Sequence, residues 1–251
     1  MLNHPTHDKR LALKLTGMAK AFSEQRDLPE SQTLSFEERL GLLVDREMTV
    51  RSDRRLTTRV RQAKLRLSAS AEDIDARHPR GLDKALMLRL VSCHWLHERH
   101  HVLITGPPGI GTTWLAWALG HKACREGYTV LYLRLPRLLQ ELPIAKGDGR
   151  YPKLMASLAK NALLILDDWG LATLNDEHRR DILELLEDRH GRGATIVTSQ
   201  LPVEHWHEAM GDPTLADAIL DRLLHHAYKI TLRGDSMRTR HAIVKHDVPT
   251  T

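Results

Sequence analysis

A glycine-rich loop between an apolar segment and a helical segment is the part of the sequence best suited to hold a phosphate group. Residues 102–105 form the apolar segment, and a helical pattern opens at Trp114. Glycines let backbone amides turn inward around phosphate oxygens, and the amino end of a helix adds partial positive charge. A hydroxyl at the last loop position, Thr113, is suited to binding Mg²⁺. The predicted nucleotide contacts are Gly106, Pro107, Pro108, Gly109, Ile110, Gly111, Thr112, Thr113 and Trp114.

The loop departs from the Walker A pattern G-x-x-x-x-G-K-[ST] at one position, because Thr112 follows Gly111 where the pattern has lysine. That lysine carries an ammonium group to the β- and γ-phosphates, whereas threonine is neutral and short. The missing contact is worth about 1.5–3 kcal/mol, so we expect weak ATP binding and very little hydrolysis. Taken alone, the loop is equally compatible with a glycine-rich turn that binds nothing.

A second motif is an apolar segment, 163–166, that ends in two carboxylates, Asp167 and Asp168. In a Walker B arrangement the first carboxylate supports Mg²⁺ and the second polarises the attacking water. A buried strand with solvated acids at its tip would look similar. The two motifs occur in the order that a nucleotide site requires, which argues against coincidence. We therefore predict an ATP–Mg²⁺ site in which Thr113 and Asp167 serve the metal and Asp168 is catalytic.

Two further polar positions are candidates for completing this site. Ser199 and Gln200 end the apolar segment that begins at residue 194, where they could sense the γ-phosphate or form an ordinary polar strand end. Arg222 lies on an amphipathic segment and could be a finger that completes a neighbouring subunit's site. Spacing alone favours a plainer interpretation, an ion pair of Arg222 with Asp217 or Asp221.

Basic residues are concentrated in 51–66. This segment contains seven Lys or Arg residues and a single acidic residue, Asp53, which leaves a net charge of about six positive charges. Neutralising DNA phosphates releases counterions, so such a helix could follow a DNA backbone. Charged runs are more often solvated helix faces. The size of the excess favours nucleic acid, and the predicted DNA contacts are Arg51, Arg54, Arg55, Arg59, Arg61 and Lys64.

The run from His97 to His101 matches the zinc-protease pattern H-E-x-x-H. That chemistry requires both histidines on one face of a continuous helix. Because His101 adjoins the apolar segment before the phosphate loop, we expect the helix to end earlier, and we see no third ligand. The pattern does not predict a zinc site.

The elements that must position the site alternate between helix and strand from about residue 82, which is typical of a parallel sheet with helical crossovers. The fold class is therefore α/β with a five-stranded parallel sheet. The predicted strands are 101–105, 128–133, 162–167, 194–199 and 228–232.

Residues 8–67 are predicted to form helices instead. One apolar face carries Leu11, Leu15, Met18 and Phe22. A capping box at 35–38 starts a second stripe, and a third helical segment carries another. The predicted parts are a small all-helical domain at 1–67, a linker at 68–81, the α/β domain at 82–240 and a tail at 241–251. The second stripe consists of Phe36, Leu40, Leu43 and Val44, and the third of Leu56, Val60, Ala63 and Leu67.

The overall composition, 41% hydrophobic and 27% charged, is typical of a soluble globular protein. The basic balance, 37 Lys+Arg against 32 Asp+Glu, permits a polyanionic partner. Two distant cysteines, Cys93 and Cys124, favour a reducing compartment. With no signal pattern and no membrane-length apolar stretch, we expect a cytoplasmic protein without a membrane partner.

Together these motifs resemble the IstB family, the helper ATPases of bacterial insertion sequences and relatives of the DnaC helicase loaders. The similarity runs from about Leu11 to Arg240. It is most specific in five stretches, 34–40 (LSFEERL), 163–170 (LLILDDWG), 196–206 (IVTSQLPVEHW), 211–223 (GDPTLADAILDRL) and 234–238 (GDSMR).

The resemblance implies an AAA+ P-loop core behind a helical N-terminal domain. It also implies ATP-dependent assembly of a homo-oligomer on double-stranded DNA and delivery of target DNA to a cognate transposase. Under this resemblance Arg222 becomes the trans-acting finger, and Ser199 with Gln200 the sensor. Thr112 departs from the family at the residue that usually contacts ATP.

Two alternatives stay open. A DnaC-like helicase loader would have a replicative helicase as its partner. A DNA-binding scaffold that does not hydrolyse ATP would account for Thr112. A small-molecule kinase is disfavoured, because paired acids suit the activation of water.

Overall fold

The computed structural model describes residues 5–28, 31, 33–65, 69–74 and 80–237. The chain divides into two compact units, Met1–Thr58 and Arg59–Thr251. The predicted boundaries at 67, 81 and 240 are finer than this division and stay predictions.

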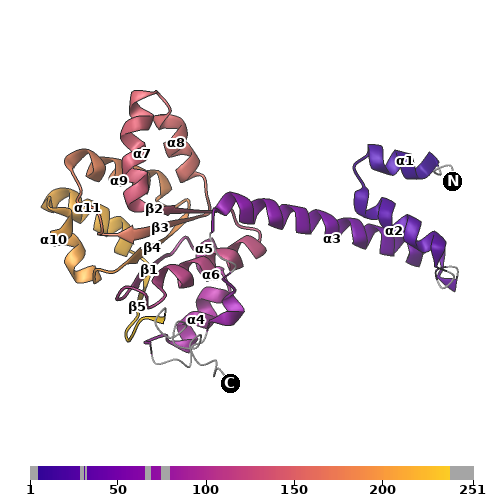
Figure 1. Ribbon diagram of the computed structural model, residues 1–251, viewed down its shortest axis with the longest axis horizontal. Coiled ribbons are helices and arrows are strands. Elements are labelled where there is room, and N and C mark those ends of the chain that lie inside the picture. The colour runs from indigo at the N-terminus through magenta and orange to yellow at the C-terminus, as the bar shows by residue number, and fades with distance from the viewer. Residues whose placement is uncertain (1–4, 29–30, 32, 66–68, 75–79, 238–251) are drawn as a thin grey trace, which may run out of the picture. The chain divides into compact units, whose positions relative to one another are not determined.

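The second unit is built on a single parallel sheet (Figure 1). Its strands are β1 (His101–Thr105), β2 (Val130–Arg134), β3 (Leu163–Trp169), β4 (Ala194–Ser199) and β5 (Ala227–Thr231), in the order β2-β3-β4-β1-β5. The predicted α/β class with five parallel strands is confirmed. The bounds of β1 and β4 agree with the prediction, and those of the other three differ at the ends.

The start of β2 shows why one boundary was misplaced. Tyr128, predicted as the first strand residue, instead closes the preceding helix, since its N–H donates to Ala123 O at 3.0 Å. Gly127 makes this turn possible with a φ of +95°, a left-handed conformation that glycine adopts without strain. The strand therefore begins only at Val130.

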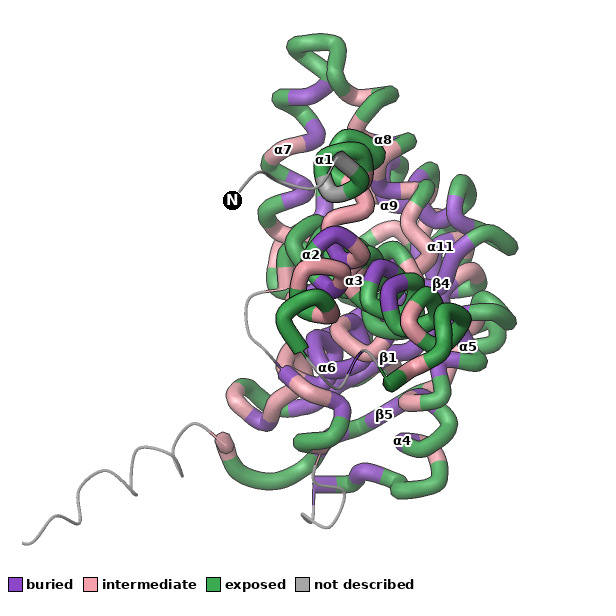
Figure 2. The backbone as a smooth tube through the Cα atoms, turned by 90° about the vertical axis from the view of Figure 1, so that its right-hand side faces the viewer, coloured by how far each residue is buried: buried purple, intermediate pink, exposed green. Residues whose placement is uncertain are grey.

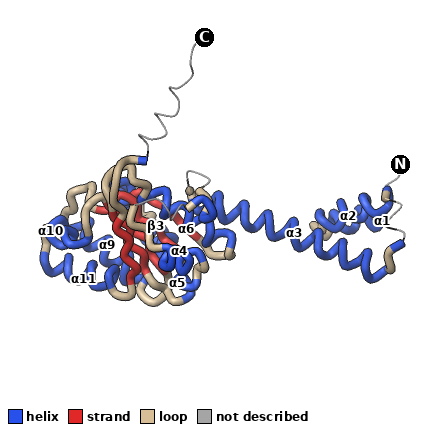
Figure 3. Tube along the Cα trace, turned by 90° about the horizontal axis from the view of Figure 1, so that it is seen from below, coloured by secondary structure: helices blue, strands red, loops and turns tan. Residues whose placement is uncertain are grey.

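Helices cover both faces of the sheet, as Figure 3 shows with the strands in red between blue helices. One face carries α6 (Thr112–Arg125), against which α4 (Lys84–Val91) and the short helix η2 (Ala71–Asp73) pack. The opposite face carries α7 (Leu135–Gly147), α8 (Tyr151–Ala159), α9 (Asp176–Arg189), α10 (Trp206–Met210) and α11 (Pro213–Leu224). Two shorter elements, α5 (His94–His97) and η3 (Val203–His205), lie before β1 and before α10.

The three inner strands, β1, β3 and β4, are buried on both faces, which accounts for their nearly continuous apolar sequences (Figure 2). Leu164 and Leu166 of β3 point into the core shared with α7 to α11. Ile165, between them, faces α6, where a Cβ on Gly120 would lie 2.9 Å from its Cδ1. Gly120 thus lets α6 approach the sheet closely.

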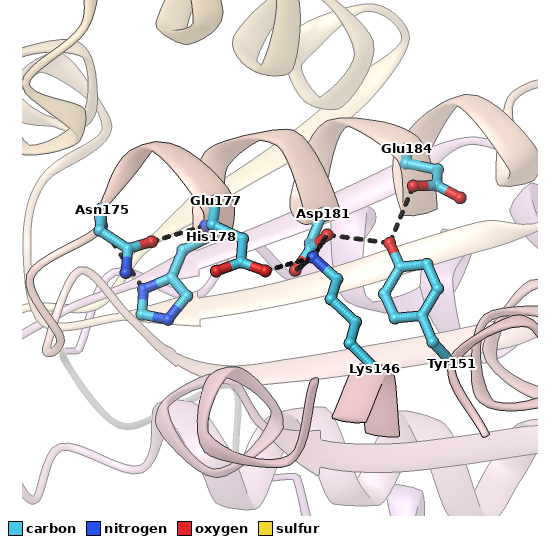
Figure 4. A network of polar contacts seen from close by, with 7 residues as sticks. All are labelled: Lys146, Tyr151, Asn175, Glu177, His178, Asp181 and Glu184. Carbon is cyan, nitrogen blue, oxygen red and sulfur yellow. Dashed lines mark hydrogen bonds and ion pairs between the residues drawn. The ribbon is translucent and has the colours of Figure 1, made fainter. Parts of the chain in front are cut away.

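A polar network fastens the α7–α8 pair to α9 (Figure 4). Lys146 Nζ of α7 lies 2.7 Å from Asp181 Oδ1 and 2.8 Å from Glu177 Oε1. The hydroxyl of Tyr151 in α8 lies 2.9 Å from the same Asp181 oxygen and 2.8 Å from Glu184. Burial and these two carboxylates raise the pKa of Tyr151, so the phenol stays a donor. The network keeps the buried Asp181 carboxylate paired.

The first unit consists of α1 (Pro5–Ala12), α2 (Thr16–Asp27) and the first part of α3 (Phe36–Ala63). The predicted capping box is confirmed, since Ser35 N donates to Glu38 Oε2 at 2.8 Å and Glu38 N donates to Ser35 Oγ at 3.2 Å. Close packing of α2 on α3 depends on Gly17, because a Cβ there would lie 2.8 Å from Arg46 O.

Three expectations for the helical region were wrong. The segments behind the capping box form one helix, α3, because no proline or glycine cap interrupts 42–63. The first predicted face divides between α1 and α2, since Lys14 is left-handed (φ +58°). In the second stripe only Leu43 is buried, while Phe36, Leu40 and Val44 are 66%, 43% and 40% exposed. Leu11 is also exposed, and Leu67 lies outside the described residues.

Within the part of the chain that the structure describes, no helix is both long enough and apolar enough to span a membrane.

Candidate nucleotide site

The glycine-rich loop connects the carboxyl end of β1 to the amino end of α6 (Figure 1). Gly109 and Gly111 have φ values of +81° and +102°, which side-chain-bearing residues adopt only with strain. The amides of Thr112, Thr113 and Trp114 lie in the first turn of α6, where a helix supplies no carbonyl for them. This set of donors fits a phosphate group.

The loop is held to the sheet at several points. Gly106 N donates to Ser199 O of β4 at 3.1 Å, and Ile110 is fully buried. On the other side, the segment after β5 lies against the loop, since Met237 N donates to Gly109 O at 2.9 Å. Pro107 and Pro108, by contrast, are exposed. These contacts fix the glycine backbone to the sheet and to the segment after β5.

The buried carboxylate of Asp167, 3% exposed, joins the two predicted motifs. Thr113 Oγ1 donates to Asp167 Oδ1 at 2.8 Å. Tyr132 of β2 donates to the other oxygen at 2.7 Å, and Thr198 of β4 donates to Oδ1 as well. Hydroxyl and carboxylate oxygens are the ligands that Mg²⁺ prefers, so Thr113 and Asp167 fit the metal of a nucleotide complex.

Asp168 is turned away from the sheet by an irregularity in β3. Its φ is +65°, and the register with β4 shifts between Leu166 and Trp169. Arg134 of β2 holds the carboxylate through Nε, 2.5 Å from Oδ2. This contact raises the pKa of Arg134. Asp168 N donates to Thr198 Oγ1 at 3.3 Å. Thr198 therefore contacts both acidic residues of the strand end.

The two predicted sensor residues lie at the end of β4, beside the acidic strand. The Ser199 hydroxyl donates to Trp169 O at 2.7 Å and accepts from Leu201 N at 3.0 Å, and the residue is 2% exposed. It thus serves the local backbone, while Gln200 is exposed. The sensor role of either residue stays a prediction.

Three of the residues that touch the acids were not singled out from sequence: Tyr132, Arg134 and Thr198. They lie in β2 and β4, the two strands that flank β3 in the sheet. The only signal available was a polar or aromatic residue near the end of an apolar segment, and the strand order was needed to use it.

Arg222 lies at the opposite end of the strands, where β1 and β5 begin. It lines a cavity with His101, the first residue of β1, and His226, which immediately precedes β5. The phosphate loop follows the other end of β1, so the length of this strand separates Arg222 from the loop. Its guanidinium donates to Ala218 O at 2.8 Å and pairs with Glu187 at 2.7 Å. The plainer expectation of a pair with Asp217 or Asp221 named the wrong partner. Arg222 does not reach the phosphate loop of its own chain.

The predicted DNA-binding residues differ in their surroundings. Arg54 and Arg55 of α3 are exposed, as are Arg61 and Lys64. Arg51 is bonded to Glu47 at 2.7 Å. Arg59 donates through Nε to Cys124 O of α6 at 2.9 Å. The exposed members of this set are therefore Arg51, Arg54, Arg55, Arg61 and Lys64, while Arg59 packs against α6.

The end of the helix before His101 is confirmed. Helix α5 stops at His97, and Arg99 is left-handed with a φ of +60°. His101 begins β1, where its Nδ1 accepts a hydrogen bond from Thr195 N at 3.0 Å. The two histidines of the H-E-x-x-H pattern thus belong to different elements and do not share a helix face.

A glycine-rich loop after β1, an acidic strand end on β3, the order β2-β3-β4-β1-β5 and helices on both faces define the fold of the AAA+ P-loop class. Solved structures share this fold. The DnaC helicase loader aligns with a TM-score of 0.54 at 19% identity, over 66% of this chain and 97% of that one. The replication initiator DnaA bound to AMPPCP and single-stranded DNA aligns with a TM-score of 0.56 at 15% identity, over 75% of this chain and 58% of that one.

Residues 9–244 match the family described as IstB-like ATP binding protein, and the chain belongs to this family. The insertion sequence ATP-binding protein y4pL of Sinorhizobium fredii is 56% identical over 95% of this chain and 97% of its own length. The ATP-binding protein of insertion sequence IS1162 from Pseudomonas fluorescens is 53% identical over 80% of this chain and 88% of its own length.

Proposed function

We propose that this chain is the ATP-binding helper of an insertion sequence, which assembles with copies of itself on duplex DNA and delivers target DNA to a cognate transposase in the cytoplasm. The observation that carries the proposal is the 2.8 Å bond between Thr113 and Asp167. In a member of the IstB-like family this contact supports a site in which Thr113 and Asp167 would hold the Mg²⁺ that accompanies ATP.

The nucleotide role is one of binding with little turnover. The loop amides and the Thr113 hydroxyl provide a phosphate and metal site, but Thr112 brings no positive charge to the transferring phosphoryl group. Asp168 would activate the attacking water after leaving Arg134, which holds it at 2.5 Å. Such a protein would use ATP mainly as a ligand that favours assembly.

The DNA role rests on the basic face of α3. Arg54 and Arg55 are exposed one turn after Arg51, so their guanidinium groups are available to backbone phosphates. Such contacts carry no sequence information, and log affinity should fall by about 0.9 per contact for each unit of log salt.

The assembly role rests on Arg222. Because it lies at the sheet edge away from its own phosphate loop, a nucleotide contact would have to be made with a neighbouring subunit. In a T112K background, an Arg222→Ala subunit mixed with an Asp168→Asn subunit should recover part of the hydrolysis, since each keeps half of a composite site. Failure to recover at every mixing ratio would show that Arg222 has no role across a boundary.

Light scattering tests the proposed nucleotide-dependent assembly on DNA. Duplex DNA with Mg²⁺ and ATP should give large particles, whereas DNA with Mg²⁺ alone should not. The variant Arg54→Ala/Arg55→Ala should lose assembly on every DNA sequence tested. Arg150→Ala/Arg192→Ala, which removes two exposed arginines of the second unit, is the matched control. Assembly that does not depend on nucleotide, or that is unchanged in the Arg54→Ala/Arg55→Ala variant, would contradict the proposal.

Thr112 also supports a narrower candidate, a DNA-binding scaffold in which ATP is bound and never hydrolysed. Assembly driven equally by ATP and by a non-hydrolysable analogue, without phosphate release, would favour this scaffold. A helicase loader is separated from both by its partner, because it would retain a replicative helicase and no transposase in a pull-down.

A further inference from the structure

A buried arginine lies beside the phosphate loop, although it is distant from the loop in sequence. Arg80 is 5% exposed. Its Nη1 would lie 3.3 Å from a Cβ built on Gly111, the residue immediately before Thr112. The guanidinium therefore lies against the loop at Gly111, one residue before the position where the motif has lysine.

The backbone around Arg80 is fastened to the carboxyl end of β5. Arg233 N donates to Arg80 O at 3.0 Å. Gly81, with a φ of +81°, packs so closely that a Cβ would lie 2.9 Å from Thr231 O. In turn, Leu232 N donates to Thr105 O at 2.7 Å, at the end of β1 from which the loop departs. The backbone at Arg80 is thus held by main-chain contacts to the segment at the carboxyl end of β5.

The chemistry of the guanidinium suits this place. It stays protonated at any physiological pH, and its planar donors match phosphate oxygens in pairs. In a buried setting, a positive charge near the loop amides acts on phosphate with less screening by water than it would at the surface. Arginine at 80 thus offers the type of group that threonine at 112 lacks.

We propose that Arg80 is a phosphate-binding residue of this chain and supplies the positive charge that Thr112 does not bring to the loop. The proposal rests on the nucleotide binding proposed above, and adds to it a residue outside the motif. Its specific consequence is an energetic coupling between positions 80 and 112.

The test measures equilibrium affinity, with no need for hydrolysis. ATP and inorganic tripolyphosphate are each titrated, with Mg²⁺, as competitors of a fluorescent ATP analogue. The variants are R80Q and R80K, each made in the parent chain and in a T112K background. R192Q, an exposed arginine at the other edge of the sheet, is the matched control.

We expect R80Q to weaken both ATP and tripolyphosphate by about 10- to 100-fold in the parent chain. In the T112K background the loss should shrink to within about threefold, because the lysine supplies the charge. R80K should stay within about tenfold of the parent, and R192Q should match it. If thermal melting shows that R80Q is unfolded, R80M replaces it, since methionine keeps the buried stem and removes the charge.

Unchanged affinity in R80Q would overturn the inference while leaving the nucleotide site intact. An equal loss in both backgrounds would make Arg80 a structural residue, and a loss for ATP without one for tripolyphosphate would move its contact to the base or ribose. Both results also overturn the inference. Absence of ATP binding even in T112K would refute the proposed nucleotide site itself, and Arg80 with it.

Discussion

A buried charged side chain lies at each of the two ends of the parallel strands, and the two charges are compensated in different ways. The end where the strands begin is called the amino edge of the sheet, and the end where they stop is called the carboxyl edge. At the amino edge, Arg189 is 1% exposed. At the carboxyl edge, Asp167 is 3% exposed. Burial of either charge is costly unless polar groups surround it, so both sites show what kind of compensation the fold provides.

Arg189 is compensated almost entirely by main-chain carbonyls. Its Nη1 donates to Leu158 O at 3.0 Å and to Asn161 O at 2.8 Å, and Nη2 donates to Ala194 O. Gly193 leaves room for it, because a Cβ there would lie 2.8 Å from Nη2. Burial lowers the pKa of Arg189 to about 10, which still leaves it protonated at neutral pH. Carbonyls fixed in the backbone make this a permanent structural contact.

Asp167 is compensated by side-chain hydroxyls from three elements, those of Thr113, Tyr132 and Thr198. Hydroxyls rotate, and each can turn a lone pair towards a cation in place of donating a proton. Under the proposed function, Mg²⁺ would therefore compensate the Asp167 carboxylate in place of these donors, without unfolding of the surroundings. The comparison suggests that the amino edge serves stability and the carboxyl edge serves exchange of ligands.

The largest effect is expected at the amino edge. Arg189→Met should lower the free energy of unfolding by about 3–5 kcal/mol, because several buried carbonyls lose their donor at once. Arg180→Met, on the exposed side of the same helix, should change it by less than about 0.5 kcal/mol. Urea denaturation measures both, and equal values would remove the distinction between the edges.

At the carboxyl edge a new charge should alter function and leave stability nearly unchanged. Thr112→Lys should raise ATP turnover by about 100- to 1000-fold, since a fixed cation stabilises charge in the transition state. Thr112→Val, neutral and similar in size, is the control and should match the parent. Phosphate release under single turnover measures the rates. A parent chain that already equals the lysine variant would assign the transition-state role to another cation.

Acid should destabilise the amino edge through His101. Burial, and then Arg189, lower the pKa of His101 to about 4 from the ordinary value of 6.5. The neutral ring therefore contributes stability that is fully present above about pH 6.5 and is lost as pH falls towards 4, by at most about 3 kcal/mol.

His101→Gln isolates this contribution, because an amide oxygen can still accept from Thr195 N and does not titrate. Unfolding free energies of parent and variant, measured from pH 7 to pH 4, should converge or cross as the parent loses more. A constant difference across this range would show that His101 has the same pKa in the folded and in the unfolded chain, and would contradict the prediction.

The smallest effect concerns the ion pair of Arg134 with Asp168. Arg134 is 48% exposed, so water screens the pair, and Arg134→Gln should cost less than about 1 kcal/mol. Arg150→Gln, which breaks the exposed pair with Asp148, should cost a similar amount. A loss as large as that of Arg189→Met would mean that Asp168 is locked and that the carboxyl edge is also structural.

Much of this architecture follows from local sequence. The inner strands β1, β3 and β4 were visible as short apolar runs, because burial on both faces demands a continuous run. The phosphate loop and the acidic pair were visible for a similar reason, since their chemistry depends on neighbours in the chain. The capping box at Ser35 was also correct, because both of its hydrogen bonds span three residues.

What sequence could not decide depends on contacts between distant residues. Apolar periodicity in 36–44 predicted burial, yet Phe36 is 66% exposed, since a helix pattern does not show whether anything covers it. Likewise, the partner of Arg222 was found on α9, at Glu187, because only packing of α11 on α9 brings the two together.

By itself, then, the sequence determined the α/β class, the strands, the place of the phosphate loop and its departure at Thr112, because covalent order and periodicity are local properties. Only the tertiary structure decided that Thr198 and Tyr132 enclose Asp167, that Arg222 lies at the far edge, and that Arg80 reaches the loop. The physical reason is the order β2-β3-β4-β1-β5, which makes neighbours of strand ends that are far apart along the chain.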